Sequence, residues 1–391
     1  MTKKSAFACN IVKWLTCSYG LLFVASVFLQ KPIYLLYFRY FGADYHYFFD
    51  AARDLIAGRN PYLNPSYVQP PLSTFVNVPL SGFDEPTAAT IFFVMNLLFV
   101  FGAIFIAQRS SDMAVTERLS IFMLPMLSAP TLMLFERGNL DGVVVILVAG
   151  TIYFLRRPLI SGVLLCAGIL VKVYPLILIF SLLGQKNWRV ILYCAVAMGA
   201  AFLALHNLFL SFFANVAARA ATAGISENLS SFTFLFALEE VFLTGNRSAD
   251  ILFKALYYAT LGLILVFGLL RDRNLSSTNR SDLEIRALMA SYLVFTINIP
   301  GLVYLYSGVM IILMLIYMLD SRLVLGKYTL ATLFLGSFFV FFPGRSFDLT
   351  LGHTKYSYVF NLLPPAGSAI LLYFFIALRF EGIKAPISVR E

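Results

Sequence analysis

Residues 158–185 read PLISGVLLCAGILVKVYPLILIFSLLGQ and decide how the chain is arranged in a membrane. The stretch is apolar except for Lys172 near its centre, and a lysine there costs a spanning helix about 2.5–3.5 kcal/mol. Pro175 follows closely and removes a backbone hydrogen-bond donor. We therefore expect two half-helices that enter and leave the membrane on the same side, a re-entrant pair with Lys172 at its tip. Broken backbone at membrane depth is tolerated where it lines a cavity, so the tip also marks a site.

The distribution of basic residues supports the re-entrant pair, because membrane proteins keep Lys and Arg preferentially on the cytoplasmic side. With the pair in place, eleven of the Lys and Arg residues that follow position 185 face the cytoplasm. Five face the outside: Arg219, Arg247, Lys254, Arg345 and Lys355. A full crossing would reverse this ratio, so the sequence predicts that both termini are cytoplasmic.

The composition is that of a multi-pass membrane protein. Hydrophobic residues make up 60% of the 391 residues, charged residues make up 13%, and the mean hydropathy is +0.83. Soluble domains carry about a quarter charged residues. Apolar stretches near the bilayer length of about 20 residues recur at roughly 11–29, 89–108, 119–135, 190–212, 251–270, 285–300, 303–319, 327–342 and 359–378, and a shorter one covers 142–155. We predict an all-α protein with about ten transmembrane helices plus the re-entrant pair.

The excess of basic residues does not indicate a nucleic-acid partner. The formal net charge is +9, but Lys and Arg are scattered between apolar stretches, so the excess fits anionic lipid headgroups instead. The chain has four cysteines: Cys9, Cys17, Cys166 and Cys194. Because they lack CxxC spacing, they predict neither a disulfide framework nor a zinc site. We expect residues 11–29 to be a retained first span, since no signal-peptide cleavage site stands out.

No soluble stretch is long enough to fold alone, so we expect a single integral membrane domain over 1–391. The topology divides it into a first outer segment at 30–88, the re-entrant pair at 158–185 and a cytoplasmic linker at 271–286, rich in Ser, Asn and Arg. Twelve of the twenty acidic residues fall on the outer face. Any chemistry is therefore expected there.

The first outer segment contains GADYHYFFDAARDLIAGRNPY, from Gly42 to Tyr62. At 100° per residue, its aromatic and aliphatic side chains between positions 45 and 56 share one face, which predicts an amphipathic helix at the membrane surface. Asp44 stands at the start of that helix, where it is either an N-cap or borders a membrane cavity. Asp50 and Asp54 fall on the opposite, solvated side beside Arg53.

Ordered motifs along the first half of the chain resemble those of a known enzyme family. They are Gly42-x-Asp44 with Pro61-Tyr62, Pro70-Pro71-Leu72 with Pro79-Leu80, Gly138-Asn139-x-Asp141, and Gly162-x-x-Leu165-x-x-Gly168-x-x-x-Lys172-x-Tyr174-Pro175. In this order they resemble the GT-C glycosyltransferases of family GT87, which includes mannosyltransferases and arabinofuranosyltransferases that use polyprenol-phosphate sugars. The resemblance is clear over about residues 40–190 and weaker through Asn228-Leu-Ser230.

The resemblance implies a GT-C fold and a transferase in the inner (plasma) membrane with its active site facing the periplasm or exterior. Such an enzyme moves a sugar from a polyprenyl-phosphate donor to a glycolipid or other envelope glycan. In the family, an aspartate of the first outer loop is the catalytic base, and that role falls on Asp44. One base suffices for a one-step, inverting transfer. We expect the lipid-linked donor to be the only co-substrate, with no cofactor and no metal. Asp50 and Asp141 are the carboxylates that would most readily contradict this expectation, by binding a metal ion.

Transfer from a lipid phosphate also requires cations that stabilise the leaving phosphate. Lys172 and Arg137 are the candidates, because the topology places both near the outer end of the bundle. Two alternatives remain open. Lys172 could extend toward the membrane interface, and Arg137 could simply pair with Glu136.

Further substrate-binding candidates within the motifs are Tyr45, Asn139, Asp141 and Tyr174. The family tends to carry a histidine in a later outer loop, near residues 300–306, where this chain has tyrosines. We expect Tyr304 or Tyr306, or else His353 of the last outer loop, to take its place.

Three other interpretations compete with this one. The first is another GT-C-type enzyme that transfers a lipid-linked group. A secondary transporter also contains broken helices with a charge at mid-membrane, but the chain shows no inverted repeat. A non-catalytic scaffold would not need Asp44 together with Lys172.

Overall fold

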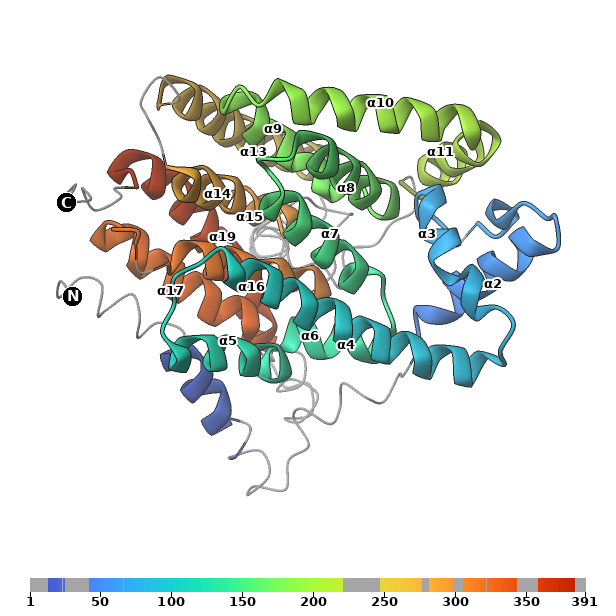
Figure 1. The fold of residues 1–391 in the computed structure, drawn as a ribbon, viewed down its shortest axis with the longest axis horizontal. Helices are drawn as coiled ribbons and strands as arrows, with labels where there is room; N and C mark the ends of the chain where they lie inside the picture. Colours follow the sequence, from blue (N-terminus) through green and yellow to red (C-terminus); the bar gives the residue numbers. More distant parts are fainter. Residues whose placement is uncertain are drawn as a thin grey trace.

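The computed structural model describes residues 13–22, 24, 42–65, 67–220, 247–275, 281–298, 305–320, 322–342 and 358–383. Within these ranges the regular elements are all helices, without a β-strand (Figure 1). The all-α class predicted from the sequence is therefore confirmed.

The helices of the first half are α2 (Tyr45–Ile56), α3 (Pro71–Asn77), α4 (Glu85–Arg109), α5 (Val115–Leu127), α6 (Ala129–Arg137), α7 (Asp141–Tyr153), α8 (Pro158–Val171), α9 (Leu178–Gly184), α10 (Trp188–Ala204) and α11 (His206–Ala220). Those of the second half are α13 (Arg247–Leu275), α14 (Asp282–Ser291), α15 (Leu293–Thr296), α16 (Met310–Met318), α17 (Lys327–Phe341) and α19 (Tyr358–Glu381). Short 3-10 turns are η2 (Pro61–Leu63), η3 (Val78–Leu80), η4 (Tyr174–Ile177) and η5 (Leu305–Val309).

Three helical segments in the described ranges are long and apolar enough to cross a bilayer: Glu85–Arg109, Ala255–Asn274 and Leu362–Glu381. Two helix pairs would raise this number to five if each counted as one span. Both pairs bend at their break, by 54° between α5 and α6 and by 95° between α10 and α11. The chain is therefore a helical protein with membrane-spanning segments, and the ten-span arrangement stays a prediction.

The bends have identifiable causes. Ser128 is extended between α5 and α6, and Pro130 restricts the residue before it and lacks an N–H group. After Leu205 the chain turns so that α11 packs on the first outer segment, where Asn215 Nδ2 donates to the carbonyl of Tyr62 at 2.9 Å. The apolar stretch predicted over 190–212 is therefore two helices in the structure, not one continuous helix.

The core is built from helices that pack along one another, α17 with α19, α4 with α7 and α8 with α10. Glycines permit the closest approaches. A Cβ atom on Gly367 of α19 would lie 2.7 Å from the carbonyl oxygen of Gly336 in α17. Every residue of α16 is buried, as expected of a helix that is apolar on all sides.

The helix predicted after Asp44 is present as α2, and its buried side chains lie on or beside the predicted apolar face: Tyr45, Phe48, Phe49, Ala51 and Ala52. Ile56, also assigned to that face, is 60% exposed because it is the last residue of the helix. Asp50 is exposed, and Asp54 forms an ion pair with Arg59 at 2.6 Å. The polar side of α2 thus faces solvent.

The segment 158–185 breaks where the sequence predicts. Helix α8 ends at Val171 because Lys172 is extended, with φ −149° and ψ 138°, and the helical path resumes in η4. Both ends of the segment lie beside the first turns of α14. Arg156 Nε is 3.2 Å from Asp282 Oδ1, and Gln185 Nε2 donates to the carbonyl of Ile285 at 3.2 Å. This proximity supports a path that turns back at Lys172.

The predicted linker at 271–286 is shorter than the sequence indicates. Helix α13 continues to Leu275, and α14 begins at Asp282. Its start is fixed by a capping box in which the Ser281 hydroxyl accepts from the Glu284 backbone N–H, while the Glu284 carboxylate accepts from that of Ser281. Residues 276–280 lie outside the described ranges.

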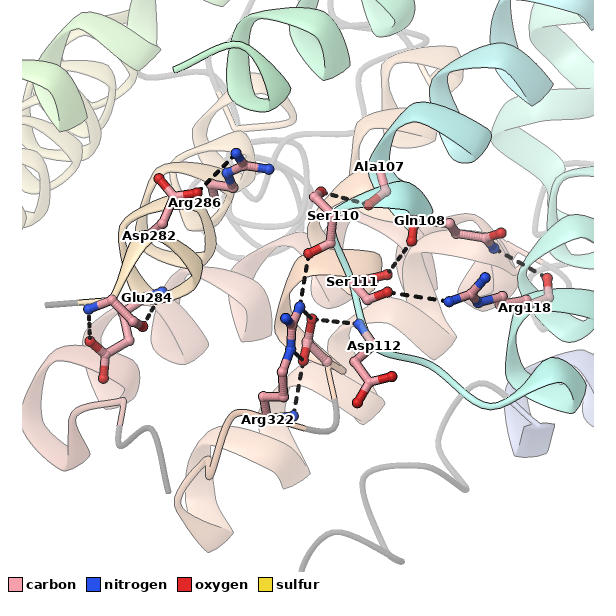
Figure 2. Close-up of polar contacts among 12 residues, drawn as sticks. Ala107, Gln108, Ser110, Ser111, Asp112, Arg118, Asp282, Glu284, Arg286 and Arg322 are labelled. Atoms are coloured by element: carbon pink, nitrogen blue, oxygen red, sulfur yellow. Dashed lines mark hydrogen bonds and ion pairs between the residues drawn. The ribbon is translucent and has the colours of Figure 1, made fainter. Parts of the chain in front are cut away.

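The end of the bundle that carries the start of α14 is rich in arginine, and we call it the basic end, defined by Arg156, Arg286 and Arg322. Figure 2 shows the polar contacts of Arg286 and Arg322. Arg286 pairs with Asp282 at 2.9 Å, and Arg322 Nη2 donates to the carbonyl of Ser110 at 2.9 Å. The first contact lies within α14, and the second fastens the turn after α16 to the end of α4.

Candidate active site

The backbone before α2 is fastened to the end of α6. Gly42 N–H donates to the carbonyl of Glu136 at 2.7 Å, and Asp44 N–H donates to the carbonyl of Arg137 at 3.0 Å. Gly42 has a φ of +75°, a conformation that suits glycine. Asp44 is thereby held at the junction of the first outer segment and the turn after α6.

The Asp44 side chain does not cap α2, although the residue occupies the N-cap position. Its Oδ2 accepts from Asn139 Nδ2 at 2.8 Å, and its Oδ1 lies 3.3 Å from Arg137 Nη1. The Asp44 side chain is 19% exposed and that of Arg137 is 18% exposed. Of the two alternatives for Asp44, the N-cap interpretation is therefore wrong, and Arg137 has Asp44 as an ion-pair partner.

Gly138 makes the turn that presents Arg137 and Asn139 to Asp44. It ends α6 in the left-handed conformation, with a φ of +66°. A Cβ atom at this position would lie 2.9 Å from Cβ of Tyr45. Both the dihedral angle and the space therefore require glycine.

A second polar cluster surrounds Asp141, the first residue of α7, whose side chain is fully buried. Its carboxylate accepts from Lys172 Nζ at 2.5 Å, from the Tyr174 hydroxyl at 2.6 Å and from the Ser307 hydroxyl at 3.1 Å. The Lys172 side chain is only 8% exposed. Lys172 therefore does not extend toward the membrane interface. It ties the tip of segment 158–185 to α7.

The two clusters are built on one short stretch, because Asn139 serves the first and Asp141 the second. Asn96 of α4 donates through Nδ2 to the carbonyl of Asn139 at 3.1 Å. Gly142 leaves room for this contact, since a Cβ atom there would meet the Asn96 amide. The buried Oδ1 of Asn139 accepts no hydrogen bond from the described part of the chain.

Tyr45 lies beneath the site. Its ring is 1% exposed and packs on Phe92, with 5.1 Å between ring centroids. Burial raises the pKa of Tyr45 well above its ordinary value, and the nearby Glu85 carboxylate raises it further. Tyr174 is likewise buried, against Asp141. The other predicted binding residues, Tyr304 and His353, and the side chain of Tyr306, lie outside the described residues.

Sequence reasoning missed Asn96 and Ser307. Asn96 carried a usable signal, because it is a polar residue in the middle of an apolar span, and such residues mark functional or packing sites. Ser307 had no signal of its own beyond its place next to residues 300–306.

No group of three His, Cys, Asp or Glu side chains is positioned to hold a metal ion in the part of the chain that the structure describes. The expectation that the reaction needs no metal and no cofactor stays a prediction.

Comparison with known proteins places the chain among glycosyltransferases. The model of glycosyltransferase family 87 matches residues 67–296, which include Asn139, Asp141 and Lys172 and begin after Asp44. GPI mannosyltransferase 1 of Kluyveromyces lactis is 30% identical over 162 residues, 39% of this chain and 40% of that protein. The Saccharomyces cerevisiae protein of the same name is 29% identical over 141 residues, 36% of this chain and 35% of that protein.

The chain therefore matches about two fifths or less of the length of these relatives. The family match, by contrast, covers more than half of the chain. Together with the helical, membrane-spanning architecture, it shows that the chain belongs to glycosyltransferase family 87.

Proposed function

We propose that this membrane protein transfers a mannosyl residue from a polyprenyl-phosphate donor to a lipid-linked or cell-envelope glycan. The observation that carries the proposal is the accessible Asp44 carboxylate beside the Arg137 guanidinium, in a chain of this family. The mannosyl group is suggested by the two relatives, both named GPI mannosyltransferase 1.

In the proposed reaction, Asp44 is the general base. It takes the proton of an acceptor hydroxyl as that oxygen attacks the anomeric carbon of the sugar. The bond between this carbon and the donor phosphate oxygen breaks, and the polyprenyl phosphate leaves with the electron pair. A cation stabilises the charge that grows on this phosphate. Because there is one displacement, the configuration at the anomeric carbon is inverted.

Arg137 is the stronger candidate for that cation. Its 3.3 Å distance to Asp44 exceeds the roughly 2.7–2.9 Å of a tight charge-assisted hydrogen bond. The donor phosphate can therefore draw Arg137 away, while Asn139 keeps Asp44 in position through its 2.8 Å hydrogen bond. Arg137 then neutralises the leaving group instead of the base.

Lys172 has a different role in this proposal. Its ammonium group is paired at 2.5 Å with the buried Asp141, so most of its charge is already compensated. Lys172 mainly holds the tip of segment 158–185 in place, and direct contact with the donor phosphate is secondary. Tyr304 and His353 remain candidates for binding the sugars.

The proposed topology has about ten spans plus the re-entrant pair, with the active site on the outer face of the plasma membrane. Its support is that the candidate site and the basic end lie at opposite ends of α7, since positive residues favour the cytoplasmic side. The lipid-linked donor reaches the site from the bilayer.

The test uses purified protein in lipid vesicles with polyprenyl-phosphate mannose and a lipid extract as acceptor. Release of polyprenyl phosphate and formation of a mannosylated lipid are measured together. We expect Asp44→Asn to lower the rate by about 10²–10⁴-fold. Asp54→Asn, which removes a solvent-side carboxylate of the same helix, serves as the control and keeps the activity.

Full activity of folded Asp44→Asn would exclude Asp44 as the general base. Sugar movement into sealed vesicles without a mannosylated product would instead favour a transporter.

A further inference from the structure

A groove of about 440 Å³ lies between the corner that joins α9 to α10 and the side of α13. Figure 1 shows α9 beside α13, at the end of the bundle away from α2. The groove is lined by Leu183, Lys186, Trp188, Leu269, Leu270 and Arg273. None of these residues contributes to the clusters around Asp44 and Asp141, so the groove is separate from the candidate active site.

The lining combines two kinds of chemistry. Lys186 and Arg273 are both exposed and provide two positive charges. The leucines provide apolar surface, and Trp188 is 59% exposed at the first turn of α10. Tryptophan is enriched where a membrane protein meets the headgroup region, and basic pockets between helices on the cytoplasmic side bind anionic lipid headgroups.

The backbone at Lys186 provides an independent observation. Lys186 has a φ of +56° and is the one residue other than glycine with a positive φ among those described. It occupies the position after α9 that normally takes glycine: Asn187 N–H donates to the carbonyl of Leu182 at 2.9 Å, and Lys186 N–H to that of Leu183 at 3.1 Å. A lysine kept in a conformation that favours glycine points to a use for its side chain.

The two walls of the groove are held in fixed proximity. A Cβ atom on Gly184 of α9 would lie 2.9 Å from Cβ of Asp272 in α13. The Asp272 carboxylate does not belong to the groove, because it is buried, pairs with Arg379 at 2.9 Å and accepts from the Tyr292 hydroxyl at 2.9 Å. The six residues that line the groove thus include two basic side chains and no acidic one.

We propose that this groove binds one anionic phospholipid. The headgroup phosphate lies between Lys186 and Arg273, and an acyl chain follows the leucines of α9 and α13. The bound lipid then links the base of segment 158–185 to α13.

The test measures thermal unfolding of the purified full chain in a zwitterionic detergent with phosphatidylcholine present. Added phosphatidylglycerol is expected to raise the unfolding temperature, whereas equal amounts of extra phosphatidylcholine or inorganic phosphate leave it unchanged. Loss of each cation weakens the apparent affinity for phosphatidylglycerol by roughly fivefold. The double variant Lys186→Gly with Arg273→Gln is thus expected to lose roughly 25-fold.

Lys186→Gly separates lipid binding from folding, because glycine relieves the backbone strain at this position. Its unfolding temperature without phosphatidylglycerol is expected to equal or exceed that of the original chain, while its response to that lipid falls. Lys327→Gln removes an exposed charge at the start of α17 and is the matched control, with an unchanged response.

An equal effect of phosphatidylcholine, an equal effect of inorganic phosphate, or a full response of the double variant would each overturn the proposal. Retention of co-purified phosphatidylglycerol, counted by native mass spectrometry, is a second measurement. It is expected to fall in the double variant and not in Lys327→Gln.

Discussion

Arg137 connects the two halves of the proposed chemistry, because it contacts the base and is the cation offered to the donor phosphate. In the structure its guanidinium lies 3.3 Å from Asp44, beside the shorter Asn139 contact at 2.8 Å. This asymmetry matters. We expect Asn139 to keep the Asp44 carboxylate in place when Arg137 contacts the donor phosphate.

Replacing Arg137 by Gln is therefore expected to affect both binding and rate. The KM for the polyprenyl-phosphate donor rises, and kcat falls by about 10²-fold because the leaving phosphate loses its cation. Arg137→Lys, which keeps the charge without the planar fork, recovers part of the rate. Steady-state kinetics with varied donor test this expectation. An unchanged donor KM together with an unchanged kcat would mean that Arg137 only orients Asp44.

A substitution at Gly138 tests whether the turn after α6 positions Arg137 and Asn139 beside Asp44. Gly138→Ala places a methyl group 2.9 Å from Cβ of Tyr45 at a φ of +66°. We expect a loss of more than about 1 kcal/mol in the free energy of unfolding and a displaced Asn139. Thermal unfolding and transfer rate are measured on the same sample. Gly82→Ala is the control, because the space around Gly82 is open. Equal behaviour of the two variants would contradict the role given to this turn.

The residue scale also shows where sequence reasoning stops. Asp44 could be singled out from its place at the start of an amphipathic pattern and from the family resemblance. The pair between Asp141 and Lys172 could not, because 31 positions separate its partners and both were assigned to substrate instead. Their mutual contact depends on how α7 and α8 pack.

At the scale of elements, the broken segment 158–185 is held by a buried ion pair, and such a pair has a characteristic response to mutation. Removing one partner leaves an uncompensated buried charge. We expect Lys172→Met to cost about 3–5 kcal/mol of unfolding free energy. Adding Asp141→Asn to this variant removes the stranded charge, so much of the loss is expected to be recovered. Unfolding measurements on the two single variants and the double variant form the cycle.

The same double variant separates structure from catalysis. If Lys172 acts by positioning, the double variant regains transfer activity along with stability. Recovered stability with activity still lost would instead show that the ammonium group contacts the donor phosphate.

The bends elsewhere in the bundle could not be predicted in the same way as the break at Lys172. A lysine and a proline in an apolar run are visible in the sequence, and they end a helix locally. The turn at Leu205, in contrast, accompanies a contact that is distant in the sequence: Asn215 donates to the carbonyl of Tyr62, 153 positions away. The sequence stays apolar across Leu205, so it predicts one continuous span. The structure instead has two helices there, α10 and α11.

On the scale of the whole molecule, the candidate site and the basic end lie at opposite ends of α7. Asp141 begins this helix in the buried cluster, and Tyr153 ends it beneath the Arg286 guanidinium, which lies 5.6 Å from the Tyr153 ring centroid. A helix of this kind fixes the distance between the two ends. If the arginines of the basic end face the cytoplasm, the candidate site at the other end of α7 faces the outside.

This orientation is tested with single cysteines introduced into a chain whose own four cysteines are replaced. Gly82→Cys lies in an open turn just before α4, on the side of the site, and Arg157→Cys lies at the exposed start of α8 at the basic end. In intact cells, a membrane-impermeant maleimide is expected to label Gly82→Cys at once and Arg157→Cys only after permeabilisation. The reverse pattern would place Asp44 on the cytoplasmic face. The donor would then have to be used on that face, and the positive-inside argument for this chain would fail. The lipid groove would in that case meet the outer leaflet, so the same labelling also decides which leaflet supplies its anionic lipid.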